Sequence, residues 1–457
     1  MAHLQAANTN IDSILNIGLT CVMVTTVDGE EPTCEVVRSP EGCTGIGIKN
    51  ATKVPGRIRL QKGDRILYDS GEYVGKESGM TIKIRGNTSA AAAGKKPYKI
   101  KLQKKADLLR RGDDFYAEKD WVLLKTGTTL NNMIGFWLSR LMGMEWTPGF
   151  EYVNLVINGD YRGIYTLTES VEQGVNRVNV PGDTGFLFEY DAYFWNEDFY
   201  IPSSFPFPVG YTFKYPDAEN LLTWKVQYMI NFISQMERSV SQDDYPQYID
   251  VESFAKWALA QDILGVRDYY GTNMFLMKDG INIDEKIRMG ILWDFDTIME
   301  LRNMWAGVHY ASFSFIRQLF INPWCTDFVS AYRRCWNKVV ENRVIENLID
   351  SLSMYGSSAA AVSADRSRML DGERWGKQCE SVEEDVSAAT VWFTDRYKFL
   401  NDTITALYSK YDATLPVPGL EQDKRQSQGC YDLQGRRLLK RPERGVYICG
   451  GKKYVVK

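Results

Sequence analysis

The sequence contains little histidine and no closely spaced cysteine pair. Of its 457 residues only two are His, and none of the eight Cys stands in a C-x-x-C arrangement. Structural zinc sites are built from closely spaced Cys and His, so the composition argues against one. The even number of cysteines permits disulfides, with Cys34–Cys43 and Cys430–Cys449 as local candidates, and spacing alone does not assign them.

The chain also lacks long apolar runs, a P-loop and an excess of positive charge. No run of 18 apolar residues occurs, so no transmembrane helix is expected. The G-x-x-x-x-G-K-[ST] pattern of P-loop NTPases is absent. The formal net charge is −4, from 54 basic and 58 acidic residues, so no nucleic-acid partner is expected. Residues 1–10 lack signal-peptide features, which predicts either a cytoplasmic protein or an exported one whose signal has been removed.

What remains is the composition of a folded protein with several parts. Apolar residues make up 44 % of the chain, charged residues 25 % and aromatic residues 13 %. These values are globular, and the length predicts two to four packed units. Near residues 210–220 the pattern changes from segments typical of strands to segments typical of helices. A two-part α+β fold with a cleft between the parts is therefore expected.

Local signals predict individual elements. Alternation predicts strands within 19–90, at 98–102 and at 186–190, and the Asn158-Gly159 turn predicts a hairpin joining 153–157 to 163–167. Helical spacing predicts helices at 130–143, 226–236, 250–265, 326–350, 357–370 and 384–409, with Asp217 and Asp250 as caps. A short strand pair is predicted at 273–278 and 287–293. The expected divisions are an N-terminal β-rich region at 1–75, a strand-rich part at 76–215, a helical part at 216–411 and a C-terminal β tail at 412–457.

Two short motifs in the helical half carry side chains suited to a divalent metal. Asp268 and Asn273 have D-x-x-x-x-N spacing, and Asp294 and Asp296 stand in the sequence Trp-Asp-Phe-Asp. In protein kinases an Asp and an Asn at this spacing orient the acceptor hydroxyl and hold a metal, and the D-F-G aspartate binds the metal that bridges the ATP phosphates. Taken alone, each motif more often marks a helix terminus or a turn.

The strand-rich half supplies a candidate phosphate-binding element. Arg85 opens the segment Arg-Gly-Asn-Thr-Ser, and the strand at 98–102 follows with Lys99 and Lys101 on one face. A strand, a turn of small residues and a strand that carries Lys is how protein kinases hold the ATP phosphates. The alternative is that both lysines are exposed residues of an edge strand.

In this order the motifs resemble the CotH (spore coat protein H) kinase family over roughly residues 80–300. The matching segments are R-G-N-[ST]-S, K-x-P-Y-K-I-K-L, W-x-L-L, N-G-x-Y-x-G-x-Y-x-L-x-E at 158–169, Gly185–Asp191, Lys214-Tyr215-Pro216, D-x-x-x-x-N and W-D-F-D. The resemblance implies a two-lobed atypical protein-kinase-like fold, with a strand-rich N-lobe and a helical C-lobe. It also implies that ATP, with Mg²⁺ or Mn²⁺, phosphorylates Ser or Thr of a protein substrate.

The resemblance further implies roles for single residues. On the ATP side, the phosphate-contacting lysine would be Lys101, with Lys99 as second choice, Arg85 would lie near the phosphates and Glu169 would orient the lysine. Asp268 would be the catalytic aspartate, and Asn273 and Asp294 would hold the metal, with Asp296 as an alternative or second ligand. The spacing leaves open which of Asp294 and Asp296 is the main ligand.

Two features support alternatives to an active kinase. At Thr126–Asn132 the chain lacks the Asp and the Arg of the family pattern D-x-[ST]-x-x-R-N. The segment Y-D-L-Q-G-R-R at 431–437 and the strands after it resemble tails of exported proteins of Bacteroidetes-type bacteria, which implies a secreted or cell-envelope protein. The alternatives are a catalytically weak, kinase-like binding or adhesion module, and an enzyme of the same fold that transfers AMP.

Overall fold

The computed structural model describes most of the chain as two compact units. The described residues are 10–205, 208–217, 222–267, 271–282, 284–306, 309 and 315–412, with strands at 430–432, 437–438, 445–449 and 452–456. One unit comprises Met1–Thr405 and the other Ala406–Lys457. The candidate site belongs to the first unit.

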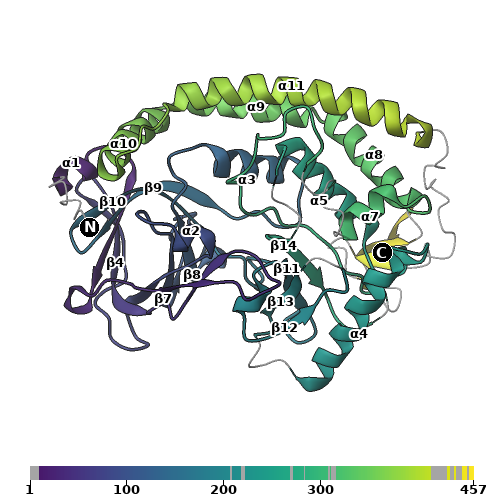
Figure 1. Ribbon diagram of the computed structural model, residues 1–457, viewed down its shortest axis with the longest axis horizontal. Helices are drawn as coiled ribbons and strands as arrows, with labels where there is room; N and C mark the ends of the chain where they lie inside the picture. Colours follow the sequence, from purple (N-terminus) through teal and green to yellow (C-terminus); the bar gives the residue numbers. More distant parts are fainter. Residues whose placement is uncertain are drawn as a thin grey trace. The chain divides into compact units, whose positions relative to one another are not determined.

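Seven strands of the first unit close into a barrel, seen around β4, β7, β8 and β10 in Figure 1. The ring runs β1 (Thr20–Thr26), β9 (Phe150–Ile157), β10 (Asp160–Glu169), β8 (Glu118–Leu124), β7 (Tyr98–Ala106), β6 (Met80–Ile84) and β4 (Val54–Lys62). Pairing of β4 with β1 completes it, and β5 (Arg65–Asp69) extends the sheet beyond β4. The β1–β9 pair is parallel and the other pairs in the ring are antiparallel.

Alternating side chains fill the barrel. Along β4 every second residue from Val54 to Leu60 is fully buried, and the residues between them are partly exposed. The same alternation places aliphatic and aromatic side chains of the other strands in one shared core: Val22, Val24, Ile82, Ile100, Trp121, Leu123, Val153, Leu155, Tyr165 and Leu167. The outward residues of β6, β7 and β8 are therefore free to line a surface site.

The α+β class is as predicted, but the prediction of a two-lobed, kinase-like fold is wrong. The finding that overturns it is the closed ring of seven strands. β1 and β4 come from the segment expected to form a separate N-terminal region, yet they complete the same barrel as β6 to β10. Alternation reveals that a segment is a strand, but it does not reveal which distant strand will pair with it.

A second, four-stranded sheet lies outside the barrel. Its order is β12 (Tyr200–Pro202), β13 (Gly210–Tyr215), β11 (Phe186–Asp191) and β14 (Met274–Lys278). A two-stranded ribbon, β2 (Glu35–Arg38) with β3 (Ile46–Lys49), is tied to the 3-10 turn Phe194–Asn196 because Asn196 Nδ2 donates to the carbonyl of Ile48.

Helices make up most of the remainder of the first unit. They are α1 (Ile11–Leu15), α2 (Thr88–Ala91), α3 (Asn131–Leu141), α4 (Thr223–Ser239), α5 (Val251–Leu264), α7 (Phe315–Ile321), α8 (Thr326–Glu341), α9 (Val344–Gly356), α10 (Ala359–Trp375) and α11 (Val382–Tyr408). α10 packs on barrel strand β10 (Figure 1), where the Asp371 carboxylate accepts from the backbone N–H of Ile164 at 2.9 Å. No helix within the described ranges has the length and apolarity needed to cross a membrane.

Most local predictions are confirmed. β9, Asn158-Gly159 and β10 form the predicted hairpin, and the Asp250 carboxylate caps α5 by accepting from the N–H of Ser253. The predicted helix at 326–350 is instead two helices, because Arg343 between α8 and α9 adopts a left-handed conformation with φ 51°. Residues 287–293 form only isolated bridges, and α4 begins after Leu222, away from Asp217.

The second unit contains a small sheet in the order β16 (Arg437–Leu438), β15 (Cys430–Asp432), β17 (Gly445–Cys449) and β18 (Lys452–Val456). Its strands fall in the region predicted to be a β tail. Cys430 and Cys449 face each other in the β15–β17 register. In the first unit Cys34 and Cys43, the other candidate disulfide pair, are both free.

Candidate functional site

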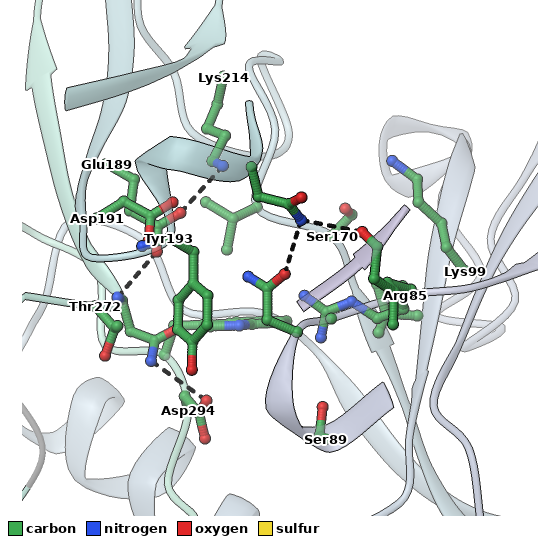
Figure 2. Close-up of a pocket in the computed structure, with 18 of the residues that line it drawn as sticks. Arg85, Ser89, Lys99, Ser170, Glu189, Asp191, Tyr193, Lys214, Thr272 and Asp294 are labelled. Carbon is green, nitrogen blue, oxygen red and sulfur yellow. Dashed lines mark hydrogen bonds and ion pairs between the residues drawn. The ribbon is translucent and has the colours of Figure 1, made fainter. Parts of the chain in front are cut away.

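A cleft of about 1420 Å³ gathers most of the predicted site residues. Its barrel side is formed by outward side chains of β6, β7 and β8, and its other side by the second sheet and the loops around Asn273 and Asp294. Figure 2 shows Arg85 and Lys99 on one side and Glu189, Asp191 and Lys214 on the other. The predicted residues that line it are Arg85, Lys99, Lys101, Asn273, Asp294 and Asp296.

The two predicted lysines leave the same face of β7, as expected, but they differ in their surroundings. The Lys99 ammonium lies 2.7 Å from Glu172 Oε1 and 3.0 Å from Asp120 Oδ1. Burial lowers the pKa of Lys99, but these two carboxylates outweigh it and the net shift is upward. Lys101 is 61 % exposed and its ammonium is 3.8 Å from Asp120 Oδ2. Lys99 is therefore the lysine that the protein holds in place.

In the Trp-Asp-Phe-Asp segment, two buried aromatic residues alternate with two carboxylates that line the cleft. Trp293 and Phe295 are buried, and the Phe295 ring contacts the Phe136 ring of α3 edge-to-face at 5.2 Å. Asp294 and Asp296 alternate with them and face the cleft. The Asp294 Oδ1 atom accepts from the backbone N–H of Asp296 at 3.3 Å, a local turn that short acidic side chains favour.

Asn273 meets Asp294 across the cleft floor. Its Nδ2 atom donates to Asp294 Oδ2 at 3.3 Å (Figure 2). Both residues have positive φ, 59° and 65°, a conformation that Asn and Asp tolerate better than other non-glycine residues. The predicted pairing of the D-x-x-x-x-N asparagine with the first aspartate of Trp-Asp-Phe-Asp is thus a close contact. Asp268, the other half of that motif, lies outside the described residues.

The carboxylates and the nearby cation influence each other's protonation. Desolvation and then the charge of Asp294 raise the pKa of Asp296 to about 7, while Lys125 and Arg85 oppose the shift. Although solvent reaches the Asp296 side chain, the cleft walls replace much of its water shell, which is why desolvation acts on it. Burial lowers the pKa of Arg85, and the charges of Asp294, Glu189 and Asp296 counteract that shift. A cation bound between the two aspartates would relieve their repulsion.

Three further residues of the cleft were not assigned roles from the sequence. Glu189 Oε1 accepts from the backbone N–H of Asn273 at 2.9 Å, and Glu189 Oε2 lies 3.1 Å from the Lys214 ammonium. Burial and then Glu189 raise the pKa of Asp191 to about 7. Burial opposes the charged form of Lys214, but Glu189 and Asp191 raise its pKa to about 12. All six residues of β11 are buried. Acidic residues within a buried strand usually have a specific partner or role, so Glu189 and Asp191 could have been singled out from the sequence on this ground.

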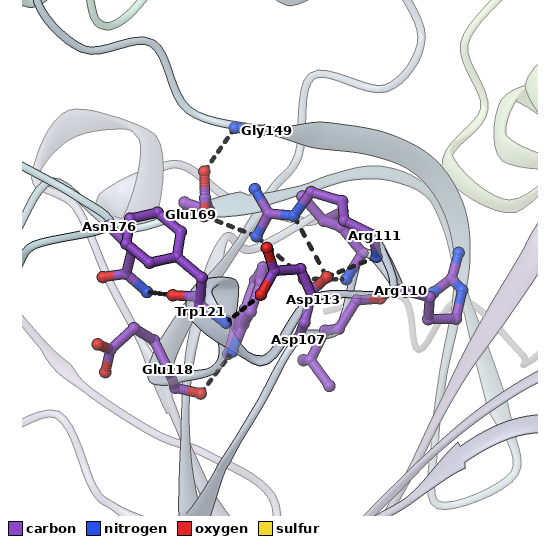
Figure 3. A network of polar contacts seen from close by, with 12 residues as sticks. Asp107, Arg110, Arg111, Asp113, Glu118, Trp121, Gly149, Glu169 and Asn176 are labelled. Carbon is purple, nitrogen blue, oxygen red and sulfur yellow. Dashed lines mark hydrogen bonds and ion pairs between the residues drawn. The ribbon is translucent and has the colours of Figure 1, made fainter. Parts of the chain in front are cut away.

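Glu169 occupies a different place from the one expected for a lysine partner. It is 2 % exposed and is not among the residues that line the cleft. Its carboxylate accepts from Arg111 Nη2 at 2.8 Å and from the Gly149 N–H at 2.6 Å, within the polar network of Figure 3. Glu172, three residues further along, is the glutamate that contacts Lys99.

The donor set of the cleft fits a hard divalent cation that shares its coordination with a ligand. Within the described ranges, no group of three or more His, Cys, Asp or Glu side chains is arranged to hold a metal by itself. Asn273 and Asp294 nevertheless offer an amide and a carboxylate in contact, and the carboxylate of Asp296, two residues further along, lines the same cleft. Mg²⁺ is commonly held by one or two carboxylates together with water and substrate phosphates, so this set is sufficient.

A protein-family model covers most of the chain. The model of the family described as CotH kinase protein matches residues 82–400. This range begins within β6 and contains β7, the second sheet and both loops of the cleft. No curated protein matches the chain.

Proposed function

The chain belongs to the CotH kinase family, and we propose that it is an ATP- and metal-dependent kinase that phosphorylates Ser or Thr of a protein substrate. Family membership gives it a kinase-like function. The observation that carries the finer proposal is the contact between Asn273 and Asp294 in a cleft whose opposite wall presents Arg85 and Lys99. Oxygen ligands on one wall and cations on the other suit a metal-bound triphosphate.

In this proposal Asn273 and Asp294 hold Mg²⁺ or Mn²⁺, which neutralises charge on the ATP phosphates. The contact with Asn273 supports Asp294 as the main ligand, and the raised pKa of Asp296 supports a secondary role for that residue. Lys99 is the better supported phosphate contact, because Glu172 and Asp120 hold it, and Lys101 is the alternative. Asp268 orients the acceptor hydroxyl.

The test is transfer from labelled ATP in the presence of Mg²⁺ or Mn²⁺. Label from the γ-phosphate appearing on protein Ser or Thr is expected. Label from the α-phosphate would instead identify AMP transfer, and no transfer with intact ATP binding would identify a binding module.

Two substitutions assign the roles. Asp268→Ala is expected to abolish transfer and preserve ATP affinity, because the acceptor is oriented mainly in the transition state. Asp294→Ala is expected to weaken metal-dependent ATP binding as well as transfer. Equal loss of ATP affinity in both variants would contradict this division of labour.

A further inference from the structure

Strand β6 directs two cations into the cleft. Met80, Ile82 and Ile84 point into the barrel core, so Lys83 and Arg85 point outward. Arg85 follows the last residue of β6, and its N–H donates to the carbonyl of Pro97, which continues the pairing with β7. Both residues line the cleft. Alternate residues of a strand are about 7 Å apart, a spacing that the oxygens of one polyphosphate chain can bridge.

The charge of Lys83 has no partner in the part of the chain that the structure describes. No ion pair within 4.0 Å and no side-chain hydrogen bond is formed by its ammonium there. Directly opposite in the β6–β7 register stands Lys99. Like charges facing each other across a strand pair are destabilising. Burial, Lys99 and Lys53 lower the pKa of Lys83, and Asp120 and Glu197, neither of which lies within 4.0 Å of its ammonium, only partly oppose this shift.

Arg85, two residues further along the same wall, also lacks a close counter-ion within the described ranges. Among the described residues its guanidinium forms no ion pair within 4.0 Å, and Asp294, Glu189 and Asp296 act on it only from longer range. Lys99, by contrast, is already neutralised by two carboxylates, and Lys101 is 61 % exposed. Lys83 and Arg85 are therefore two neighbouring cations of the cleft without a carboxylate of a described residue within 4.0 Å, and Lys125, whose ammonium donates to the carbonyl of Ser89, is a third cation on the same wall.

From this geometry we infer that Lys83 and Arg85 form an anion subsite for a polyphosphate chain, and that Lys83 is a phosphate-binding residue in its own right. The inference rests on the proposed function, since it says where the phosphates of the bound nucleotide lie. A nucleotide and free inorganic polyphosphate share this chemistry, so both serve as probes.

The experiment compares Lys83→Gln with the matched control Lys104→Gln, which alters an exposed lysine of the neighbouring strand β7 that does not line the cleft. Affinities for ATP, tripolyphosphate and adenosine are measured by calorimetry with and without Mg²⁺. Lys83→Gln is expected to weaken ATP and tripolyphosphate binding by about tenfold or more, the usual worth of a hydrogen bond to a charged group. Adenosine binding should not change, and Lys83→Arg should retain most of the affinity.

A second readout separates this role from a structural one. Because Lys83 is a partly buried, unpaired cation opposite another lysine, Lys83→Gln is expected to leave the melting temperature of the free protein unchanged or raised. A side chain that merely supports the fold would lower it. Unaltered polyphosphate affinity in Lys83→Gln, an equal loss in Lys104→Gln, or a wild-type protein that binds neither ATP nor tripolyphosphate would overturn the inference.

The outcome is distinguishable from failure of the proposed function. If Lys83→Gln weakens tripolyphosphate binding while the wild-type protein transfers no label from ATP, the anion subsite stands and the kinase proposal fails. If label is transferred and Lys83→Gln binds and transfers as the wild type does, the kinase proposal stands and the subsite is refuted.

Discussion

Glu169 and Glu172 are three positions apart in the sequence, but their substitutions are expected to have opposite effects on stability and on ligand binding. Glu169 is 2 % exposed and faces Arg111 at 2.8 Å and Arg177 at 3.6 Å. Glu169→Ala leaves these two guanidinium groups without their shared carboxylate. Removing one partner from a buried ion pair costs about 3–5 kcal/mol. For a unit that extends to Thr405, with about 2 cal/mol/K of unfolding entropy per residue, this is a fall of about 4–6 °C in melting temperature.

Glu172→Gln is expected to affect ligand binding rather than stability. The Glu172 side chain is 32 % exposed and its ion pair with Lys99 is partly solvated, so its loss should cost no more than about 1 kcal/mol. Its effect should appear in ligand binding and transfer, because Lys99 loses the partner that holds it toward the cleft. Asp120 still contacts Lys99, so the loss should be partial.

The assay is thermal unfolding of both variants, paired with ATP affinity and transfer. Glu169→Gln serves as a control that keeps the shape of the side chain and removes its charge. The amide oxygen can still accept from the Gly149 N–H, but the side chain cannot neutralise Arg111. The reasoning is refuted if Glu169→Ala melts with the wild type, or if Glu172→Gln destabilises the protein as strongly as Glu169→Ala does.

Three further predictions follow from single features. Gly135→Ala would drive a methyl group into the Phe295 ring and is expected to destabilise the protein by about 1–3 kcal/mol and to abolish the metal dependence of ATP binding, measured by thermal shift with and without Mg²⁺. The raised pKa of Asp191, about 7, means that the folded state takes up a proton that the unfolded state takes up only near pH 4, so stability falls as pH rises through this window. Asp191→Asn should therefore raise the melting temperature at about pH 8 and leave it unchanged at about pH 5; an equal rise at both would contradict the assignment. Truncation after Asp412 should leave the melting temperature of the larger unit nearly unchanged, because Ala406–Lys457 is a compact unit of its own, and a collapse of soluble yield would contradict this.

Local features of the fold could be predicted from the sequence because their causes are local. The Asn158-Gly159 hairpin and the Asp250 cap of α5 depend on neighbouring residues alone. Barrel closure could not, because it depends on β1 pairing in parallel with β9 more than a hundred residues later. The break between α8 and α9 was missed because Arg343 adopts positive φ without the glycine that usually signals it.

The residues of the candidate site also differ in whether the sequence alone could identify them. Asn273 and Asp294 could be proposed from motif spacing, and they are in contact. Lys83 and Glu172 could not, because their relation to Lys99 depends on strand register and on the path of the chain after β10. Glu169 was predicted to orient the lysine because of its place in the family motif. Its buried carboxylate instead contacts Arg111 and lies near Arg177, away from the cleft.

The closed barrel explains how the cationic wall of the cleft is kept in place. A slip of β6 by one residue against β7 would turn Lys83 into the apolar core and expose Ile82 to solvent. In an open sheet an edge strand is bonded on one side only, but in a ring each strand is bonded on both sides. The facing lysines are repulsive in the absence of an anion, so the register must be held by other forces. Packing of the barrel core supplies these forces, and it thereby keeps two cationic side chains on the outward face although they repel each other.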